Sequence, residues 1–363
     1  MIDDHGHPFA LEGGRLDLAA LTLDVNPDEG GDERRARLGP ARLWQEMLTT
    51  RLAARLGCEP GDVPAARAES SRDWTPYVRG LFADAGITGL VMDVAYPPDA
   101  FNRLETFQEL TGCAVHPIFR TDPLVDRLIG EGAGAAEIVD GVTSAMADAA
   151  SRGHVGFKTI MAYRTGLAVD PAVSEREAEE SLRERDVPVR RRGKGLRDLV
   201  ITRALATAAE LGLPFQIHTG FGDSEIRLAE SNPLLLEELL RSPQGSAGRI
   251  DLIHGGFPWH EEVAFLAATK TNVWVDVSLF NIFSPATVGD RLLRLVDLAP
   301  VHRLLMGTDG FHEPELYWFA ATVLRDAWKV VRRRLHEAGA GDAWLADAEA
   351  RMFEDNAREL YGI

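Results

Sequence analysis

The sequence predicts an α/β fold, namely a (β/α)₈ barrel of the TIM type. Eight short apolar segments recur along the chain, each seven or eight residues long, which is a normal strand length. Helical patterns lie between them, and such alternation is typical of a parallel sheet. Eight strand–helix units favour a closed barrel over an open sheet. The expected strands span residues 1–7, 89–95, 113–120, 154–161, 214–220, 249–256, 272–278 and 302–309.

The expected strands and helices differ in their apolar pattern. The runs LVMDVA in 89–95 and RIDLIHGG in 249–256 are almost continuously apolar, as expected of parallel strands that are covered on both faces. Residues 199–213 have apolar side chains at helical spacing, and we expect Gly212 to cap this helix at its carboxyl end.

The length of 363 residues fits one barrel domain over residues 1–363 with two insertions. Residues 10–88, after the first strand, contain the helical pieces ARLWQEMLTTRLAARLG and SSRDWTPYVRGLFADAG. Residues 167–197, after the fourth strand, are dense in mixed charge and predict a solvated helix followed by a basic turn. The alternative is a lid whose arginines at 190–192 meet an anionic substrate. The segment WLADAEARMFEDNARELYGI is expected to pack back on the barrel.

The composition restricts the classes of partner. Lys and Arg number 39 against 56 Asp and Glu, which gives a net charge of −17. This balance disfavours nucleic acids and anionic membrane surfaces as partners. Residues 1–14 lack a signal-peptide pattern, and no apolar stretch is long enough to span a membrane, so we expect a cytoplasmic protein. A small-molecule substrate is the expected partner, and the sequence allows a homo-oligomer without predicting one.

Candidate metal ligands stand where the expected strands end, and barrel active sites lie at these carboxyl ends. His5 and His7 form an HxH pair, which an extended chain directs to one face. Each such residue alone has an ordinary explanation: a core histidine, a helix-capping aspartate or an ion-paired lysine. Their coincidence on several strands predicts a metal site, and imidazole and carboxylate suit zinc, manganese or iron. The further candidates are Lys158 in GFKTI, His218 in FQIHTG, His254 in LIHGG and Asp309 in MGTDG.

These positions resemble the amidohydrolase superfamily, a group of (β/α)₈ barrels with HxH on the first strand. Members also carry a ligand on the fourth strand in many cases, histidines on the fifth and sixth, and an aspartate on the eighth. The ending FEDNARELYGI is similar to that of the amidohydrolase-2 group. The segments GFKTIMAYRTGL, FQIHTGFGD, LIHGGFPWHEE and TDGFHEPELYW resemble the amidohydrolase-type domain of FluG and nodulin-like proteins.

The resemblance implies that His5, His7, His218 and Asp309 hold a divalent ion that activates water, with zinc expected first and manganese or iron as alternatives. Asp309 would move the proton, and His254 would bind a second metal or polarise the substrate carbonyl. Lys158 would be carboxylated and bridge two ions; the alternative is a single ion that Lys158 does not bind.

The expected activity is hydrolysis of an amide-type C–N bond in a small carboxylate-bearing substrate. A decarboxylase, hydratase or isomerase of the same superfamily is the first alternative, and a non-catalytic binding barrel is the second. A non-catalytic barrel predicts the loss of one or more ligand residues, and none is lost in this sequence.

Substrate contacts are expected from side chains just beyond the strands. Arg164 could bind a substrate carboxylate in a bidentate pair, or it could form an ion pair with a loop acid. Arg120 allows the same two interpretations. Tyr163 and His312 are expected to face the pocket.

Overall fold

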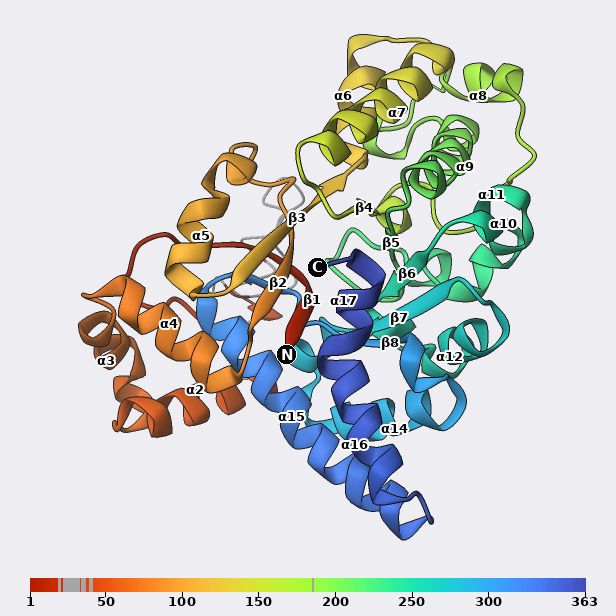
Figure 1. Ribbon diagram of the computed structural model, residues 1–363. Coiled ribbons are helices and arrows are strands. Elements are labelled where there is room, and N and C mark those ends of the chain that lie inside the picture. The colour runs from red at the N-terminus through yellow and green to blue at the C-terminus, as the bar shows by residue number, and fades with distance from the viewer. Residues whose placement is uncertain (19–20, 22–32, 34–36, 39–41, 185) are drawn as a thin grey trace.

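The computed structural model describes the chain except residues 19–20, 22–32, 34–36, 39–41 and 185 (Figure 1). Its strands form one sheet in which every neighbouring pair is parallel, in the order β8-β7-β6-β5-β4-β3-β2-β1-β9. All eight predicted strands are confirmed. They are β1 (Ile2–Phe9), β2 (Gly89–Asp93), β3 (Ala114–Arg120), β4 (Gly156–Thr159), β5 (Phe215–His218), β6 (Ile250–Ile253), β7 (Val273–Val277) and the divided β8 (Leu304–Met306) and β9 (Gly310–His312).

The eighth strand closes the barrel in two pieces. β8 pairs with β7, while β9 pairs with β1 through Gly310 and His312. Only Gly307, Thr308 and Asp309 separate the pieces, so the first and last strands meet across this short break. The prediction of one continuous strand over 302–309 is therefore wrong beyond Met306.

Helices cover the outside of the sheet (Figure 1). The predicted helix over 199–213 is confirmed as α9, which begins five residues earlier and ends at the expected Gly212 cap, where φ is 68°. The helices are α2 (Leu43–Leu56), α3 (Val63–Ser70), α4 (Trp74–Ala85), α5 (Leu104–Thr111), α6 (Asp122–Glu131), α7 (Ala135–Ser151), α8 (Glu175–Ser181), α9 (Lys194–Leu211), α10 (Glu237–Arg241), α11 (Pro243–Ala247), α12 (His260–Thr269), α13 (Phe280–Phe283), α14 (Val288–Leu298), α15 (Pro314–Glu337), α16 (Asp342–Ala350) and α17 (Asn356–Tyr361).

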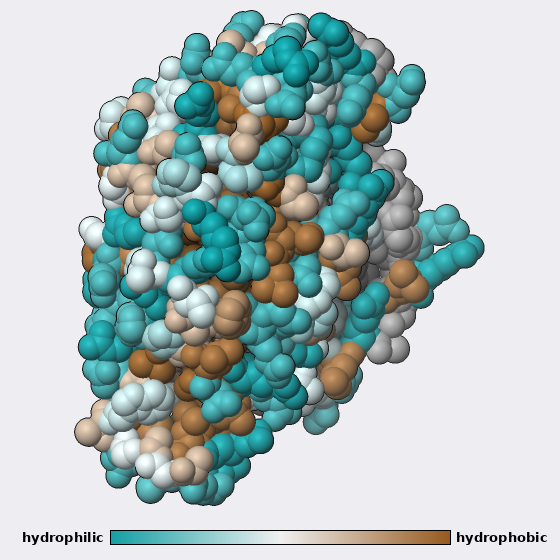
Figure 2. All heavy atoms as spheres, turned by 90° about the vertical axis from the view of Figure 1, so that its right-hand side faces the viewer, coloured by the Kyte–Doolittle hydropathy of each residue, from teal (hydrophilic) through white to brown (hydrophobic). Residues whose placement is uncertain are grey.

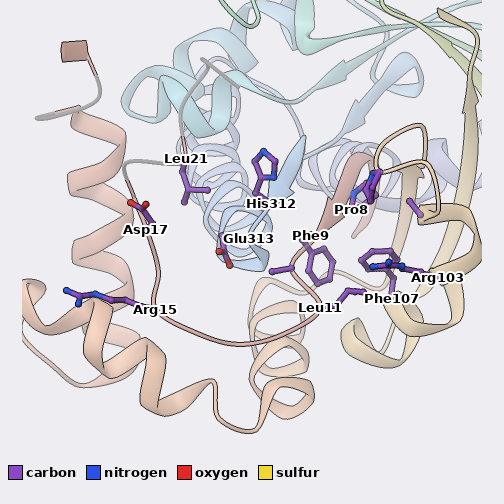
Figure 3. Close-up of a pocket in the computed structure, with 13 residues that line it drawn as sticks. Pro8, Phe9, Leu11, Arg15, Asp17, Leu21, Arg103, Phe107, His312 and Glu313 are labelled. Atoms are coloured by element: carbon purple, nitrogen blue, oxygen red, sulfur yellow. The ribbon is translucent and has the colours of Figure 1, made fainter. Parts of the chain in front are cut away.

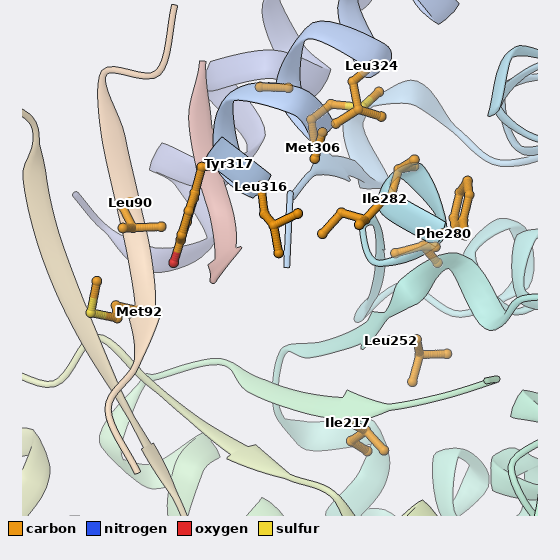
Figure 4. Close-up of a cluster of buried hydrophobic side chains, with 14 of the residues drawn as sticks. Leu90, Met92, Ile217, Leu252, Phe280, Ile282, Met306, Leu316, Tyr317 and Leu324 are labelled. Carbon is orange, nitrogen blue, oxygen red and sulfur yellow. The ribbon is translucent and has the colours of Figure 1, made fainter. Parts of the chain in front are cut away.

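The hydrophobic core lies between the strands and these helices, and Figure 4 shows side chains contributed by β2, β5, β6, β8, α13 and α15. Figure 2 shows that apolar patches interrupt a largely hydrophilic surface on one face of the molecule. None of the described helices is long and apolar enough to cross a membrane.

The helical insertion after β1 is anchored by a buried arginine. Arg67 of α3 donates to Glu315 Oε1 at 2.7 Å, to Glu313 Oε2 at 2.6 Å and to the carbonyl oxygen of Gly14 at 2.7 Å. Its guanidinium lies 4.9 Å from the centre of the Trp74 ring. Arg67 and Glu315 are 1% and 0% exposed, so the charges are removed from water together. The insertion is thereby fixed to the residues that follow β9.

The charged segment 167–197 contains α8, which begins with a capping box at Ser174, and then a basic turn. Arg190 forms an ion pair with Glu225 at 3.1 Å, and Arg191 donates to the Glu225 carbonyl oxygen. Arg192 donates to the carbonyl oxygen of Val187. The structure thus has a short helix and a basic turn in this segment, and a lid function stays a prediction.

The carboxyl-terminal helix packs back on the barrel, as predicted, and the structure places it over the amino-terminal ends of the strands. Leu360 and Tyr361 of α17 pack with Ile2, Trp274 and other residues near the strand starts. The Tyr361 hydroxyl accepts from Gln216 Nε2 at 2.7 Å and donates to Asp251 Oδ2 at 3.3 Å. Asp251 has no exposed surface, and this burial raises its pKa to about 7. The pKa of this carboxyl group in the barrel interior is thus close to 7, so the group is partly protonated at neutral pH.

Replacing Arg67 with Leu should reduce the free energy of unfolding by about 3–5 kcal/mol, because it leaves the buried Glu315 carboxylate without a counter-charge. Arg72→Leu is the matched control, since Arg72 pairs with Glu69 while both side chains are more than half exposed; its cost should stay below about 1 kcal/mol. Urea unfolding of both variants measures the difference, and equal costs would contradict the anchoring role.

Asp251→Asn should gain stability relative to the parent chain as the pH rises from 4 to 8. A carboxyl whose pKa is raised in the folded state binds more protons in the folded chain than in the unfolded chain. The free energy of unfolding of the parent therefore falls by up to about 4 kcal/mol as the pH rises through this range, and an amide at position 251 contributes no such loss. Denaturant unfolding at several pH values measures the difference in unfolding free energy between the two chains. A difference that does not vary with pH would contradict the neutral buried carboxyl.

Candidate metal centre

Three predicted metal ligands meet at the carboxyl end of β1. His5 Nε2 lies 3.3 Å and His7 Nε2 3.1 Å from Asp309 Oδ1. One ligand atom from each of the three residues lies within 4.8 Å of the other two. The HxH spacing therefore brings both imidazoles to one point, opposite the carboxylate that follows β8.

The glycine between the two histidines is required by close packing. A Cβ atom on Gly6 would lie 2.6 Å from the Tyr317 hydroxyl oxygen, and one on Gly310 would lie 2.4 Å from the Tyr317 ring. The Tyr317 hydroxyl donates to the carbonyl oxygen of His7. The Tyr317 ring on α15 thus packs against the outside of β1 and β9, while the side chains of His5 and His7 point inward.

Asp309 is positioned by the break between β8 and β9. Its backbone is left-handed, with φ of 53°, and its N–H donates to the carbonyl oxygen of His5 at 2.8 Å. Just before it, Thr308 donates to the Asp3 carboxylate from its N–H at 2.7 Å and from its hydroxyl at 2.5 Å. A positive φ is uncommon for a side-chain-bearing residue and is often found at functional sites.

His218 and His254 extend the cluster from β5 and β6. His254 Nε2 lies 3.0 Å from His218 Nδ1, and His254 Nδ1 lies 4.0 Å from Asp309 Oδ2. His218 Nε2 lies 3.1 Å from the carbonyl oxygen of Phe221. The structure therefore brings the four predicted histidines and Asp309 into one contiguous group.

Lys158 reaches the same group from β4. Its Nζ atom lies 2.8 Å from His5 Nε2 and 3.0 Å from Asp93 Oδ2. Arg120 donates to the same Asp93 oxygen from Nε at 2.7 Å. Burial alone would raise the pKa of Asp93, but Arg120 and Lys158 outweigh it and hold that pKa far below its ordinary value. Two cations thus surround one carboxylate beside the proposed ligands.

The predicted substrate contacts lie in different surroundings, some beside the cluster and some away from it. The Tyr163 ring lies 4.7 Å from the His218 ring, and its hydroxyl accepts from the Asp223 N–H. Arg164 Nε binds Asp126 at 3.1 Å, which is the ion-pair alternative. Arg120 is also ion-paired, although next to the cluster. His312 lines a cavity at the barrel mouth.

The buried imidazoles are neutral at physiological pH. Burial, reinforced by Lys158, lowers the pKa of His5 to about 4 and that of His218 to about 3. Burial and His218 lower the pKa of His254 well below its ordinary value. Burial alone would raise the pKa of Asp309, but His254 and His5 outweigh it and keep it well below its usual range. Neutral imidazoles and a carboxylate are the protonation states that ligate metals.

The polar atoms that face the cluster fit a divalent ion. Asp309 Oδ1, which faces Nε2 of His5 and of His7, is buried and has no hydrogen-bond partner among the residues that the structure describes. An orphaned buried carboxylate oxygen is costly unless a cation satisfies it. Two imidazole nitrogens and a carboxylate oxygen are also a common donor set for zinc, manganese and iron.

The sequence did not single out three residues that hold this group in place. Asp276 accepts from the His254 N–H, and Ser278 Oγ lies 2.6 Å from His254 Nδ1 while donating to Asp276 Oδ1 at 2.8 Å. Asp93 is the third. Each lies at or just beyond the end of β2 or β7, so a search of every strand end for carboxylates and hydroxyls would have found them.

Comparison with known proteins agrees with this geometry. An amidohydrolase family model matches residues 122–363, which is more than half of the chain. The chain belongs to the amidohydrolase family. The chain is similar to protein FluG from Emericella nidulans, with 33% identity over 204 residues. That match covers 52% of this chain and 23% of FluG, so the chain spans less than a quarter of its relative.

Solved structures share the fold. A candidate metal-dependent hydrolase from Lactobacillus casei superposes with a TM-score of 0.84 at 23% identity, over 99% of this chain and 95% of that one. Uronate isomerase from Thermotoga maritima gives 0.69 at 14% identity, over 99% and 94%. These likenesses establish a TIM-barrel architecture that amidohydrolase-type proteins share, and family membership implies a divalent metal.

Proposed function

We propose that the chain is a metal-dependent hydrolase that activates water to cleave an amide-type C–N bond in a small carboxylate-bearing substrate. The observation that carries the proposal is the convergence of His5, His7 and Asp309, whose ligand atoms lie within 4.8 Å of one another. Family membership supports metal dependence. Zinc is the metal proposed first, with manganese or iron as alternatives.

The ion would be held by Nε2 of His5 and His7 and by Asp309 Oδ1, with His218 as the further ligand proposed from the sequence. When bound there, a divalent ion lowers the pKa of water toward ~7 and supplies hydroxide at neutral pH. Asp309 stays ionised because of its lowered pKa, so it can accept the water proton and return it to the leaving nitrogen. His254 contacts Ser278 through Nδ1 and His218 through Nε2, so it would polarise the substrate carbonyl only after giving up one of these contacts.

The chemical state of Lys158, carboxylated or not, determines whether the centre would hold two metal ions or one. A carboxylated Lys158 would place a second anion beside Asp93, with Arg120 as the neighbouring cation, whereas an ammonium neutralises Asp93 directly at 3.0 Å. These contacts favour the single-ion alternative over the carboxylated bridge that the sequence suggested.

A substrate carboxylate is supported by the charges next to Lys158. Lys158 and Arg120 balance the charges of Asp93 and of the ionised Asp309, so a bound divalent ion would make the site locally positive. Arg120 keeps 15% of its side chain exposed while it pairs with Asp93, and a guanidinium can bind a carboxylate in a bidentate pair. We propose Arg120, Tyr163 and His312 as substrate contacts, and Arg164 only if its pair with Asp126 opens.

The second candidate is a non-hydrolytic reaction of the same superfamily. It is favoured by the superposition on uronate isomerase over nearly the whole chain, although 14% identity establishes the fold alone. The same histidines and aspartate would serve such a reaction, so the products distinguish the two candidates.

Incubation of the zinc-loaded chain with a panel of amides of small carboxylic acids, including γ-glutamyl amides, should release amine or ammonia with one carboxylic acid formed per bond cleaved. Asp309→Asn should reduce kcat/KM by at least ~100-fold, because the proton acceptor is lost. Asp326→Asn is the control, since Asp326 is half exposed and pairs with Lys329 on α15. Release of carbon dioxide, an isomer of unchanged mass, or full activity of Asp309→Asn would contradict the proposal.

A further inference from the structure

A cavity of about 570 Å³ opens at the rim of the barrel (Figure 3). Its walls come from residues 8–11, 15, 17 and 21 at and after the end of β1, from residues 97, 100, 103 and 107 after β2, and from residues 312–313 at the end of β9. All three segments leave the carboxyl ends of strands, where barrel active sites are built. The volume lies in the range of small-molecule sites, which is ~300–1,000 Å³.

The floor of this cavity is apolar and preformed. The rings of Phe9 and Phe107 meet edge to face at 5.2 Å, and the two residues are 5% and 2% exposed. Leu21 and Ala100, which also line the cavity, are buried. Leu11 is half-buried at the wall. Because these side chains belong to the hydrophobic core, the floor exists before any ligand arrives.

The charged groups at the cavity are mostly engaged by the protein itself. Glu313 is held by the buried Arg67 at 2.6 Å, and Arg103 forms an ion pair with Asp99 one helical turn away. Asp17 also has an interaction partner. A ligand would therefore gain more from covering the apolar floor than from a new ion pair.

The cavity adjoins the proposed ligands along the chain. Pro8 directly follows His7, and His312 comes three residues after Asp309. β1 and β9 are paired at this point, with Phe9 opposite His312. His7 and Asp309 do not line the cavity themselves, but its lining begins at the residue after His7 and at the third residue after Asp309.

We propose that the cavity is a substrate subsite that takes an uncharged apolar group, an aryl or branched alkyl substituent. The substrate would then carry its polar, carboxylate-bearing part at Arg120 and its apolar part over Phe9 and Phe107. This inference rests on the proposed function, because it extends the substrate of the same centre.

Acyl hydroxamates test the subsite, because the hydroxamate group chelates a metal and the acyl tail is variable. For the zinc-loaded chain, 4-phenylbutyrohydroxamate should bind at least about tenfold more tightly than acetohydroxamate, as apolar burial adds to the same chelating group. Isothermal titration calorimetry gives the ratio of the two dissociation constants.

Leu11→Trp fills the cavity from its half-buried wall and should reduce this ratio to about one, and Leu11→Phe should give an intermediate ratio. Leu228→Trp is the matched control, since Leu228 is 43% exposed and lies outside the lining; its ratio should equal that of the parent. A ratio near one in the parent, or a ratio that Leu11→Trp and Leu11→Phe leave unchanged, would overturn the subsite.

Failure of the metal centre gives a different result. The chain would then retain no zinc and bind neither hydroxamate, which contradicts the proposed function. In that case the subsite is tested without metal, by measuring the binding of the neutral fluorescent probe N-phenyl-1-naphthylamine to the metal-free chain. Saturable binding that Leu11→Trp weakens at least about tenfold supports the cavity, and absence of binding overturns it.

Discussion

The closure of the barrel between β1 and the divided eighth strand is the constraint on which the metal centre depends. Two contacts define it: the Asp309 N–H donates to the His5 carbonyl oxygen at 2.8 Å, and the buried Asp3 carboxylate accepts from Thr308. Together they place the Asp309 side chain over the two imidazoles of the HxH pair. Tyr317 occupies the outer side of the same junction, where Gly6 and Gly310 leave room for its ring.

Ionisable groups are sorted by depth inside the barrel. At the mouth, burial keeps the imidazoles of His5 and His218 neutral, and Lys158 and Arg120 balance Asp93. Deeper in, burial raises the pKa of Asp251 to about 7, so this carboxyl is partly protonated at neutral pH. Although the net charge of the chain is −17, a divalent ion bound beside Lys158 and Arg120 would make the proposed substrate site locally positive.

Much of this arrangement is predictable because strand ends have a strong sequence signature. An apolar run followed by a histidine or aspartate located five of the six ligand candidates, those on β1, β5, β6 and the eighth strand, and parallel pairing brings such ends together. The break after Met306 was not predictable, since the left-handed backbone of Asp309 depends on its bond to His5 rather than on a local motif.

The partners of the arginines were also beyond the sequence. Arg164 binds Asp126 of α6, and Arg67 binds Glu313 and Glu315, which lie more than 200 positions along the chain. Charge patterns do not reveal such distant pairs, because a surface arginine and a buried one look alike in sequence. The roles of Asp93 and Ser278 depend in the same way on contacts between strands that are separated along the chain.

The position of the metal tests the central claim most directly. A crystal structure of the zinc-loaded chain, with anomalous scattering measured at the zinc edge, locates the ion without reference to any substrate. The account predicts a peak within about 2.0–2.2 Å of Nε2 of His5, Nε2 of His7 and an oxygen of Asp309. A peak elsewhere in the barrel, or a bound ion that Asp309 does not touch, would contradict it.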